Sequence, residues 1–598
     1  MQKYKSRKEV PEKYKWDLSD FFKNEEDFDD NFKKCKKMVK AIADYRGCTE
    51  NPKRLLEFLE KDVEVSNLMQ NLGSYCYLIN DQELGNSKSI EKLGSCENLS
   101  SQLVLNESFF ENELLELSNN HYKALFKKEK GLLKYKDMLD KIYRNKEHVL
   151  SEKEERIITR LLNAMNNFDE MSSTMLNMEH DYGTITINGE EEKIATTNKR
   201  RLMKNKEVKV RKEVFEKFNQ VINRYGVSSA QFLNGYVKAN LECAKIHNFD
   251  NAWEQKLFHL NMPNEAYKAL VRVVERNTSI LQKYYRLFKK TLNLKELHTY
   301  DLNMDMAASE KEYSIEEAQE TILKAIEPLG EEYQKLFKKI FDGRYVDFAQ
   351  YPGKCSGAYS LATETVNSRI LMSFNYDLDS VSTLAHEGGH NVHHQLVSLN
   401  NPVIYRDVSN LVAEVASLTN ECLLSHYLAN NAENKKEKLA GINNILKVII
   451  SNLFGAVREG KMEQDFYEYV SEDGILTKDY MDELTRNSLK KYYGDEVILE
   501  DLDDCSWILR SHFYMNYYLY NYAFCISIAS YVSSEILNGN KQMLDNYMKF
   551  LSTGSNVWPK DAFKILGVDL TGEKVYESAI QYFDSLLNEY EEILEGGE

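Results

Sequence analysis

The stretch LAHEGGHNVHHQL, Leu384 to Leu396, decides most of what the sequence says about fold and chemistry. It contains the pattern H-E-x-x-H, which brings its two histidines together only on a helix. His386 and His390 then lie about 40° apart around the axis, so both imidazoles can reach one ion at about 2.0–2.1 Å. Glu387 lies on the adjacent flank, off the line of the ligands. The pattern predicts a helical zinc site with Glu387 as general base.

Such a site needs a third protein ligand. His394 continues the stripe of His386 and His390, but eight residues of helix span about 12 Å, so these three cannot converge on one ion. We expect His393 and His394 to support the ligands, to contact substrate or simply to pack. The third ligand is therefore expected to be an acid from a second element.

The segment NLVAEVASLTNECLLSHYL, residues 410–428, offers that acid. It is apolar nearly all round, which predicts a buried helix where a carboxylate is costly unless it is paired or bound to a metal. Glu414 has small and apolar neighbours that would allow close approach, and we expect it to be the ligand. Glu421 shares its face and is expected to orient a histidine, or to replace Glu414 as ligand. Asp407 is a third candidate.

Two glycines, Gly388 and Gly389, stand in the middle of the H-E-x-x-H pattern. Glycine inside a helix costs about 1 kcal/mol relative to alanine. Gly388 points about 180° from the metal direction and Gly389 about 80° to one side, so neither faces the ion. We expect the glycines to be contact points where another backbone comes close.

Composition limits the class of protein. The chain has 598 residues, 42% hydrophobic and 29% charged, with only 7 prolines, which predicts a globular and mostly helical protein. The net charge of −17 disfavours nucleic acid and anionic membranes as partners. Nine scattered cysteines without a C-x-x-C pair, no secretory signal and no run of about 18 apolar residues predict a cytoplasmic protein without a membrane segment.

The chain changes character twice. Residues 15–180 read as successive amphipathic helices, and DYGTITINGEEEKI, Asp181 to Ile194, predicts a β-hairpin that ends this region. We therefore expect an N-terminal helical domain, residues 1–195, and a catalytic domain, residues 196–598. Later, RILMSFNY reads as a strand just before the H-E-x-x-H helix, for which Ser380 is the expected N-cap.

Several motifs together resemble a known family. HEGGH followed by AEVAS, with Glu414 24 residues beyond His390, is similar to the thimet-oligopeptidase-like (M3) zinc metallopeptidases, and most similar to their oligoendopeptidase F branch. KYKWDLSDFF, SGAYS, RILMSFN and HFYMNYYLYNYA occur in the order of that branch. Two features depart from it. Gly388 stands where a larger apolar residue is usual, and WILRSHFY lacks the Ile-Pro that commonly precedes the histidine.

The resemblance implies a mainly α fold, a large helical ellipsoid with a deep channel and a small β-sheet beside the zinc helix. RILMSFN would be an edge strand that pairs with the substrate backbone. One Zn²⁺ per chain would be bound by His386, His390 and Glu414, with Glu387 activating water. The residues expected to bind substrate are Gly357, Ala358, Tyr359, Tyr514 and His394.

The run HFYMNYYLYNYA, His512 to Ala523, reads as a late helix rich in tyrosine. A zinc hydrolase needs donors for the oxyanion that forms on the attacked carbonyl, and phenol or imidazole groups can supply them. The resemblance favours Tyr520 and Tyr517 as catalytic residues, with His512 also lining the cleft. The other tyrosines of the run are expected to form an aromatic core.

Together these features predict a zinc-dependent endopeptidase that hydrolyses short unstructured oligopeptides. One alternative is a C-terminal exopeptidase of the dipeptidyl carboxypeptidase type on the same fold, which needs a positive group for the terminal carboxylate. Another is a non-catalytic helical scaffold, which predicts no stoichiometric zinc. The sequence carries no signal for the oligomeric state.

Overall fold

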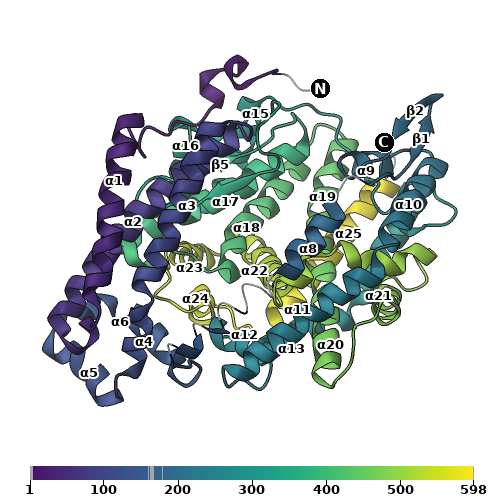
Figure 1. Cartoon of the computed structure of the whole chain (residues 1–598). Coiled ribbons are helices and arrows are strands. Elements are labelled where there is room, and N and C mark those ends of the chain that lie inside the picture. The colour runs from purple at the N-terminus through teal and green to yellow at the C-terminus, as the bar shows by residue number, and fades with distance from the viewer. Residues whose placement is uncertain are drawn as a thin grey trace. The chain divides into compact units, whose positions relative to one another are not determined.

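The computed structural model describes residues 4–151, 153–155, 157, 158, 161, 167–177 and 180–596. The chain divides into two compact units, each assembled from three segments. Unit 1 comprises Met1–Glu155, Glu310–Leu424 and Gly539–Leu566, and unit 2 comprises Arg156–Ser309, Ser425–Asn538 and Gly567–Glu598. Helices dominate the described residues, which contain only two small sheets, so the mainly α class is confirmed (Figure 1). This division by contacts does not have a boundary at residue 195. The two domains expected from the sequence stay a prediction.

Unit 1 begins with three long helices that pack on one another (Figure 1). Asparagine side chains cap all three, because Asn24, Asn51 and Asn86 each accept a hydrogen bond from a backbone N–H of the first turn. The α-helices of unit 1 are α1 (Glu25–Ile42), α2 (Pro52–Gln82), α3 (Ser87–Glu107), α4 (Phe109–Glu116), α5 (Asn119–Lys128), α6 (Lys136–Tyr143), α15 (Ile315–Ala325), α16 (Gly330–Asp342), α17 (Leu378–Asn400), α18 (Asn410–Asn430, which continues into unit 2), α23 (Lys541–Leu551) and α24 (Pro559–Leu566).

A three-stranded sheet packs against α17. Its strands are β3 (Val346–Asp347), β4 (Tyr359–Leu361) and β5 (Arg369–Leu371), in the order β3-β5-β4. β5 runs parallel to β3 and antiparallel to β4. The expectation that RILMSFN forms an edge strand is therefore wrong, because both sides of β5 are already paired. The two strands at the edges of the sheet are β3 and β4.

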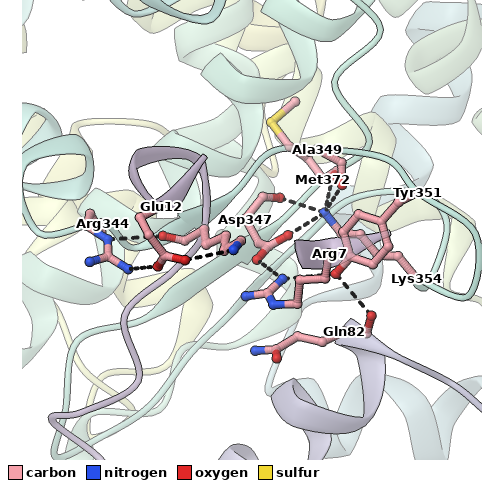
Figure 2. A network of polar contacts seen from close by, with 10 residues as sticks. Arg7, Glu12, Gln82, Arg344, Asp347, Ala349, Tyr351, Lys354 and Met372 are labelled. Atoms are coloured by element: carbon pink, nitrogen blue, oxygen red, sulfur yellow. Dashed lines mark hydrogen bonds and ion pairs between the residues drawn. The ribbon is translucent and has the colours of Figure 1, made fainter. Parts of the chain in front are cut away.

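A buried ion pair ties the loop before β4 to this sheet (Figure 2). Lys354 Nζ lies 2.7 Å from Asp347 Oδ1, and both side chains are fully buried. The same ammonium donates to the backbone oxygens of Asp347, Ala349 and Met372 at 2.8–3.0 Å. Arg7 donates to Asp347 Oδ2 at 2.5 Å and to Tyr351 Oη at 2.9 Å. Burial lowers the pKa of Lys354, which Asp347 partly offsets.

We expect Lys354→Met to destabilise the protein by about 3–5 kcal/mol, because it removes one partner of a buried pair and leaves three carbonyl oxygens without their donor. The midpoint of urea unfolding measures the effect. Lys335→Met is the matched control, since Lys335 pairs with Glu331 on the surface of α16, where both side chains are more than three-quarters exposed. That change should cost at most about 1 kcal/mol. Equal midpoints for the two variants would contradict the structural role of Lys354.

Unit 2 contains the predicted hairpin. β1 (Thr184–Ile187) pairs antiparallel with β2 (Glu190–Lys193), and the turn residues Asn188 and Gly189 both have positive φ, as a two-residue hairpin requires. The hairpin is confirmed. The other elements described in unit 2 are α8 (Asn167–Asn177), α9 (Thr196–Met203), α10 (Val208–Asn223), α11 (Gly226–Ile246), α12 (Ala252–Leu260), α13 (Asn264–Arg276), α14 (Thr278–Thr291), η7 (Thr299–Asp301), α19 (Lys435–Ile449), η10 (Ile450–Gly455), α20 (Ala456–Ser471), α21 (Lys478–Tyr493), η11 (Asp501–Leu509), η12 (Ser511–Tyr514), α22 (Leu519–Leu537) and α25 (Lys574–Glu595).

One helical stretch, Lys435–Ser471, runs through α19, the π-helix η10 and α20. One 18-residue window of it has a mean hydropathy of 1.4, so by length and composition alone it could cross a membrane. However, 61% of that window is buried inside the protein. The apolar character of this stretch therefore fits a core helix of unit 2.

Candidate metal centre

Helix α17 carries the H-E-x-x-H pattern and begins at Leu378 (Figure 1). Its N-cap is Asp377, whose Oδ1 accepts the backbone N–H of Ser380 at 2.9 Å and its hydroxyl at 2.6 Å. The expectation that Ser380 is the cap is wrong, because the helix starts one turn earlier. Asn391 anchors the helix to the strand region by donating to the backbone oxygen of Ser368 at 3.1 Å. These contacts fix the helix beside the sheet of unit 1.

His386, His390 and Glu414 point at one another from α17 and α18. Nε2 of His386 lies 3.2 Å from Nε2 of His390, and Oε2 of Glu414 lies 3.3 and 3.4 Å from these two atoms. Ligands at about 2.0–2.1 Å from zinc in tetrahedral geometry are separated by about 3.3 Å. The triangle thus has the size of three zinc ligands, and a tetrahedral ion would keep a fourth position open. Among the described residues, these three form the group of His, Cys, Asp or Glu side chains whose ligand atoms lie close enough together to hold one metal ion.

Glu421 supports this triangle from about two turns further along α18. Its Oε1 accepts a hydrogen bond from Nδ1 of His386 at 2.7 Å, which leaves Nε2 of that ring available as a ligand. Ser382 donates to the other oxygen of Glu421 at 3.2 Å, and Ser417 donates to Oε2 of Glu414 at 2.9 Å. The fallback assignment of Glu421 as a ligand is disfavoured, because its carboxylate lies on the far side of the His386 ring.

The electrostatics of the site favour a cation. Burial alone would lower the pKa of His386, but its hydrogen bonds to Glu414 and Glu421 outweigh burial and raise that pKa well above its usual range. Burial would raise the pKa of Glu414, but hydrogen bonds to His386 and His390 hold it well below its usual range. With Glu387, three carboxylates surround two imidazoles. Such a donor set of nitrogen and oxygen atoms fits a divalent ion such as zinc.

Glu387 lies on the same helix and is 8% exposed. Burial raises its pKa, which the neighbouring His386 and His390 partly oppose. A carboxylate with a raised pKa in a dry site is suited to accept and return a proton. Glu387 is not part of the ligand triangle. This position agrees with the separation between ligands and base that the sequence predicts.

The two glycines of the pattern have different neighbours. A Cβ on Gly389 would lie 2.8 Å from Cα of Ser417 and 2.9 Å from the backbone oxygen of Ala416, so the backbone of α18 comes as close as expected. A Cβ on Gly388 would overlap the ring of Phe337, which is fully buried on α16. The expectation of a close backbone is therefore confirmed for Gly389 and wrong for Gly388, where a side chain occupies the space.

The other two histidines of α17 lie outside the triangle. His393 is 1% exposed, and its ring lies 6.3 Å from that of Phe550, roughly parallel to it. Burial lowers the pKa of His393 well below its usual range, and burial with the charge of His390 lowers that of His394 to about 4. Both rings are therefore neutral near pH 7. Packing accounts for His393, while substrate contact by His394 stays a prediction.

The residues Gly357, Ala358 and Tyr359 lead into the edge strand β4. Gly357 has a φ of +91°, a conformation that favours glycine. The hydroxyl of Tyr359 donates to Oδ2 of Asp81 on α2 at 2.8 Å. This contact, and the ion pair of Lys354 just before it, fix the strand on both flanks. The structure therefore places these three residues on a defined sheet edge of unit 1.

The predicted oxyanion donors belong to unit 2, and they do not form one helix. His512 lies in η12, and α22 begins only at Leu519. Between them Asn516 and Tyr517 both have positive φ, of 45° and 57°, although neither is glycine. The expectation of a continuous helix is wrong here. The three-residue spacing of Tyr514, Tyr517 and Tyr520 therefore does not describe their directions.

The three tyrosines have different surroundings. Tyr520 is fully buried, with its ring 5.4 Å from that of Tyr267 and 5.9 Å from that of Trp253. Tyr517 is 3% exposed and lines a cavity of about 1010 Å³ in unit 2. The backbone oxygen of Tyr514 accepts the hydroxyl of Tyr236 at 2.7 Å. Their catalytic and substrate-binding roles stay predictions.

Glu463 on α20, which holds this segment, was not predicted from the sequence. Its Oε1 accepts the backbone N–H of Tyr517 at 2.7 Å, and the side chain is fully buried. Burial raises the pKa of Glu463 to about 8. Asn516 is held as well, by a hydrogen bond from Tyr467 at 2.7 Å. Two glutamates four residues apart among the apolar residues of a helix, Glu459 and Glu463, are the signal that could have drawn attention to it.

Comparisons with known proteins give matches to family models and to curated relatives. The model of peptidase family M3 matches residues 201–582, and that of oligopeptidase F matches residues 113–181. Oligopeptidase PepF of Bacillus subtilis is 31% identical over 98% of this chain and 88% of its own length. The oligoendopeptidase F homolog of Borreliella burgdorferi is 30% identical over 99% of this chain and its full length.

A solved structure is similar over almost the same range. The crystal structure of oligoendopeptidase-F from Enterococcus faecium has a TM-score of 0.73 at 25% identity, and covers 96% of this chain and 100% of that one. The family model covers more than half of the chain and includes the whole triangle of His386, His390 and Glu414. The chain therefore belongs to peptidase family M3, in its oligopeptidase F branch.

Proposed function

We propose that this peptidase is a zinc-dependent endopeptidase that cleaves short unstructured oligopeptides. The observation that carries the proposal is the triangle of His386, His390 and Glu414, whose edges of 3.2–3.4 Å match the spacing of zinc ligands. These three residues would hold one ion per chain. When bound, zinc supplies a Lewis acid that polarises the scissile carbonyl and makes water nucleophilic near neutral pH.

The protein's own groups carry the proton transfers. Glu387 accepts a proton from the attacking water and then delivers it to the nitrogen of the leaving amine. Glu421 holds His386 through Nδ1 and so keeps its ligand atom in place. Tyr517, Tyr520 and His512 are the proposed source of a donor to the oxyanion. The surroundings of Tyr520 favour a core role for that residue over the other two.

The substrate backbone is proposed to pair with β4 rather than with β5. β4 is one of the two edge strands of the sheet, so its outer backbone groups can extend the sheet with an extended peptide. Gly357, Ala358 and Tyr359 would then contact the peptide. The net charge of −17 disfavours nucleic acids as partners. We propose peptides as substrates and a cytoplasmic location.

Metal analysis tests the proposal directly. We expect one zinc per purified chain, loss of peptide cleavage when a chelator removes it, and recovery when zinc is added back. Cleavage of a peptide with an amidated C-terminus, at an internal bond, separates the endopeptidase from the C-terminal exopeptidase. A chain that folds without stoichiometric zinc and cleaves nothing would support the scaffold alternative.

A further inference from the structure

A second cavity of unit 2 is lined in part by His512. It has a volume of about 420 Å³, within the usual range of roughly 300–1,000 Å³ for ligand pockets. The π-helix η10, residues Ile450–Gly455, forms part of its wall. π-Helices are rare, and they occur frequently at functional sites. The size of the cavity and its π-helical wall make it a candidate ligand site.

More positively than negatively charged side chains line this cavity. Arg458 and Arg510 both approach the same oxygen, Oε1 of Glu459, with guanidinium nitrogens at 2.7 and 2.8 Å. Glu459 is 6% exposed, and the side chain of Arg458 is 10% exposed. Two guanidinium groups thus share a single carboxylate. With one carboxylate for two guanidinium groups, the cluster keeps one excess positive charge.

The donors of the two arginines are only partly used. Each guanidinium has five N–H groups, which can hold a carboxylate through two parallel hydrogen bonds. Within the part of the chain that the structure describes, Glu459 is the carboxylate that pairs with both, and Met462 Sδ is a further, weak acceptor 3.8 Å from Arg458. The side chain of Arg510 is 47% exposed, so a ligand can reach it from solvent.

A third cation lies near the same point. Burial and, to a smaller extent, the charge of Arg510 lower the pKa of Lys199 to about 8, against the opposing effect of Cys505. The ammonium lies 3.7 Å from the centre of the Phe218 ring. Positive charge is therefore concentrated around Arg510, whereas the chain as a whole has a net charge of −17. Such a local excess in an acidic protein favours an anionic ligand.

Arg510 and Ser511 stand where the oligoendopeptidase F branch commonly has Ile-Pro, directly before the histidine. The guanidinium that completes the cluster thus comes from the segment that departs from the branch. The hydroxyl and amide of Ser451 and Asn452 on the π-helix add polar groups to the wall. These groups can hydrogen-bond a carboxylate but not an apolar side chain.

We propose that the cavity bounded by Arg458, Arg510 and His512 is an anion subsite that binds a carboxylate of the peptide substrate. This inference rests on the proposed function, which puts His512 in contact with substrate. The carboxylate comes either from the C-terminus of the peptide or from an aspartate or glutamate side chain. In both cases a single negative charge would balance the excess positive charge of the cluster.

The test measures binding without turnover, on zinc-loaded Glu387→Gln protein with labelled mid-length peptides. One pair of peptides differs only in a free or amidated C-terminus, and a second amidated pair differs only in one Glu or Gln. We expect the charged member of one pair to bind about tenfold more tightly, as a charge-assisted hydrogen bond allows. The pair that discriminates identifies the source of the carboxylate.

Arg510→Gln should abolish this discrimination and leave the affinity for the neutral peptides unchanged, and Arg510→Lys should restore part of it. With Glu387 intact, the same change should raise KM for the charged peptide at constant kcat. Arg286→Gln is the matched control, because Arg286 pairs with Glu496 at 2.8 Å on the surface of unit 2. It should keep the full discrimination.

Two results would overturn the subsite. The first is equal affinity within both peptide pairs, and the second is an Arg510→Gln variant that weakens charged and neutral peptides alike. Failure of the proposed function looks different, because zinc-loaded protein with Glu387 intact would then cleave none of the four peptides. The two ideas therefore fail separately.

Discussion

Replacing Glu387 with Gln is expected to lower kcat for peptide cleavage by about 10²–10⁴-fold while zinc stays bound. Glutamine keeps the volume of the buried side chain but can neither accept nor return a proton. The residue is not part of the ligand triangle of His386, His390 and Glu414, so the metal site should be preserved. Cleavage of a mid-length peptide measures the loss of kcat. The zinc content of the same preparation shows whether the metal stays bound.

A matched change shows that the loss comes from the base. Thr383→Val alters a partly buried residue of the same helix whose hydroxyl donates to the backbone oxygen of Asp379 at 2.8 Å, four residues from Glu387. It should leave kcat within about threefold, since surface changes of this kind cost little. If Glu387→Gln retained activity near that of the original protein with zinc bound, Glu387 would not be the base.

The metal centre could be predicted from the sequence because two of its residues lie four positions apart on one helix. A spacing of four residues on a helix determines that His386 and His390 share one face, whatever the rest of the chain does. The third ligand required more, since Glu414 comes from another helix. Its apolar and small neighbours, which allow close packing, were a usable signal. Glu421 could be assigned to the same face of that helix by its spacing from Glu414.

The features that sequence patterns missed depend on tertiary pairing or on the backbone of single residues. An apolar strand of this length can be central or at an edge, and only the pairing partners of β5 decide it. The segment from His512 to Tyr520 has a helix-like composition. Two left-handed residues, Asn516 and Tyr517, break it because hydrogen bonds from Tyr467 and to Glu463 hold them.

The two units could not be read from the order of the chain for a similar reason. Each unit collects three segments that are separated along the chain by segments of the other unit. The hairpin at residues 184–193 is a real local feature, but the division of contacts does not follow it. Local patterns therefore predict elements and the zinc ligands, while the assembly of segments requires the structure.

Gly389→Ala is expected to reduce zinc affinity and kcat/KM by roughly 10–100-fold, the loss typical of displaced supporting groups around a metal. The added Cβ would lie 2.8 Å from Cα of Ser417 and 2.9 Å from the backbone oxygen of Ala416. Backbone atoms cannot rotate away, so α17 and α18 must separate. Glu414 lies one turn before Ser417 on α18, and the separation would move its carboxylate away from His386 and His390.

Two other glycines serve as controls for this argument. Gly73 in α2 has no neighbour within 4 Å of an added Cβ, so Gly73→Ala should stabilise the protein by about 0.5–1 kcal/mol and leave zinc binding unchanged. At Gly388 the obstacle is the side chain of Phe337, so Phe337→Leu should relieve much of the damage of Gly388→Ala. No such second change should rescue Gly389→Ala.

The contrast between Gly388 and Gly389 gives the helix cost of the HEGGH sequence a physical reason. One glycine makes room for an aromatic ring of the core, and the other allows two helix backbones to approach closely enough for ligands from both to meet. Zinc affinity, measured by competition with a chelator, distinguishes the two roles. A Gly389→Ala protein with unchanged affinity would mean that α18 can shift without moving Glu414, and close packing would then not be what positions the third ligand.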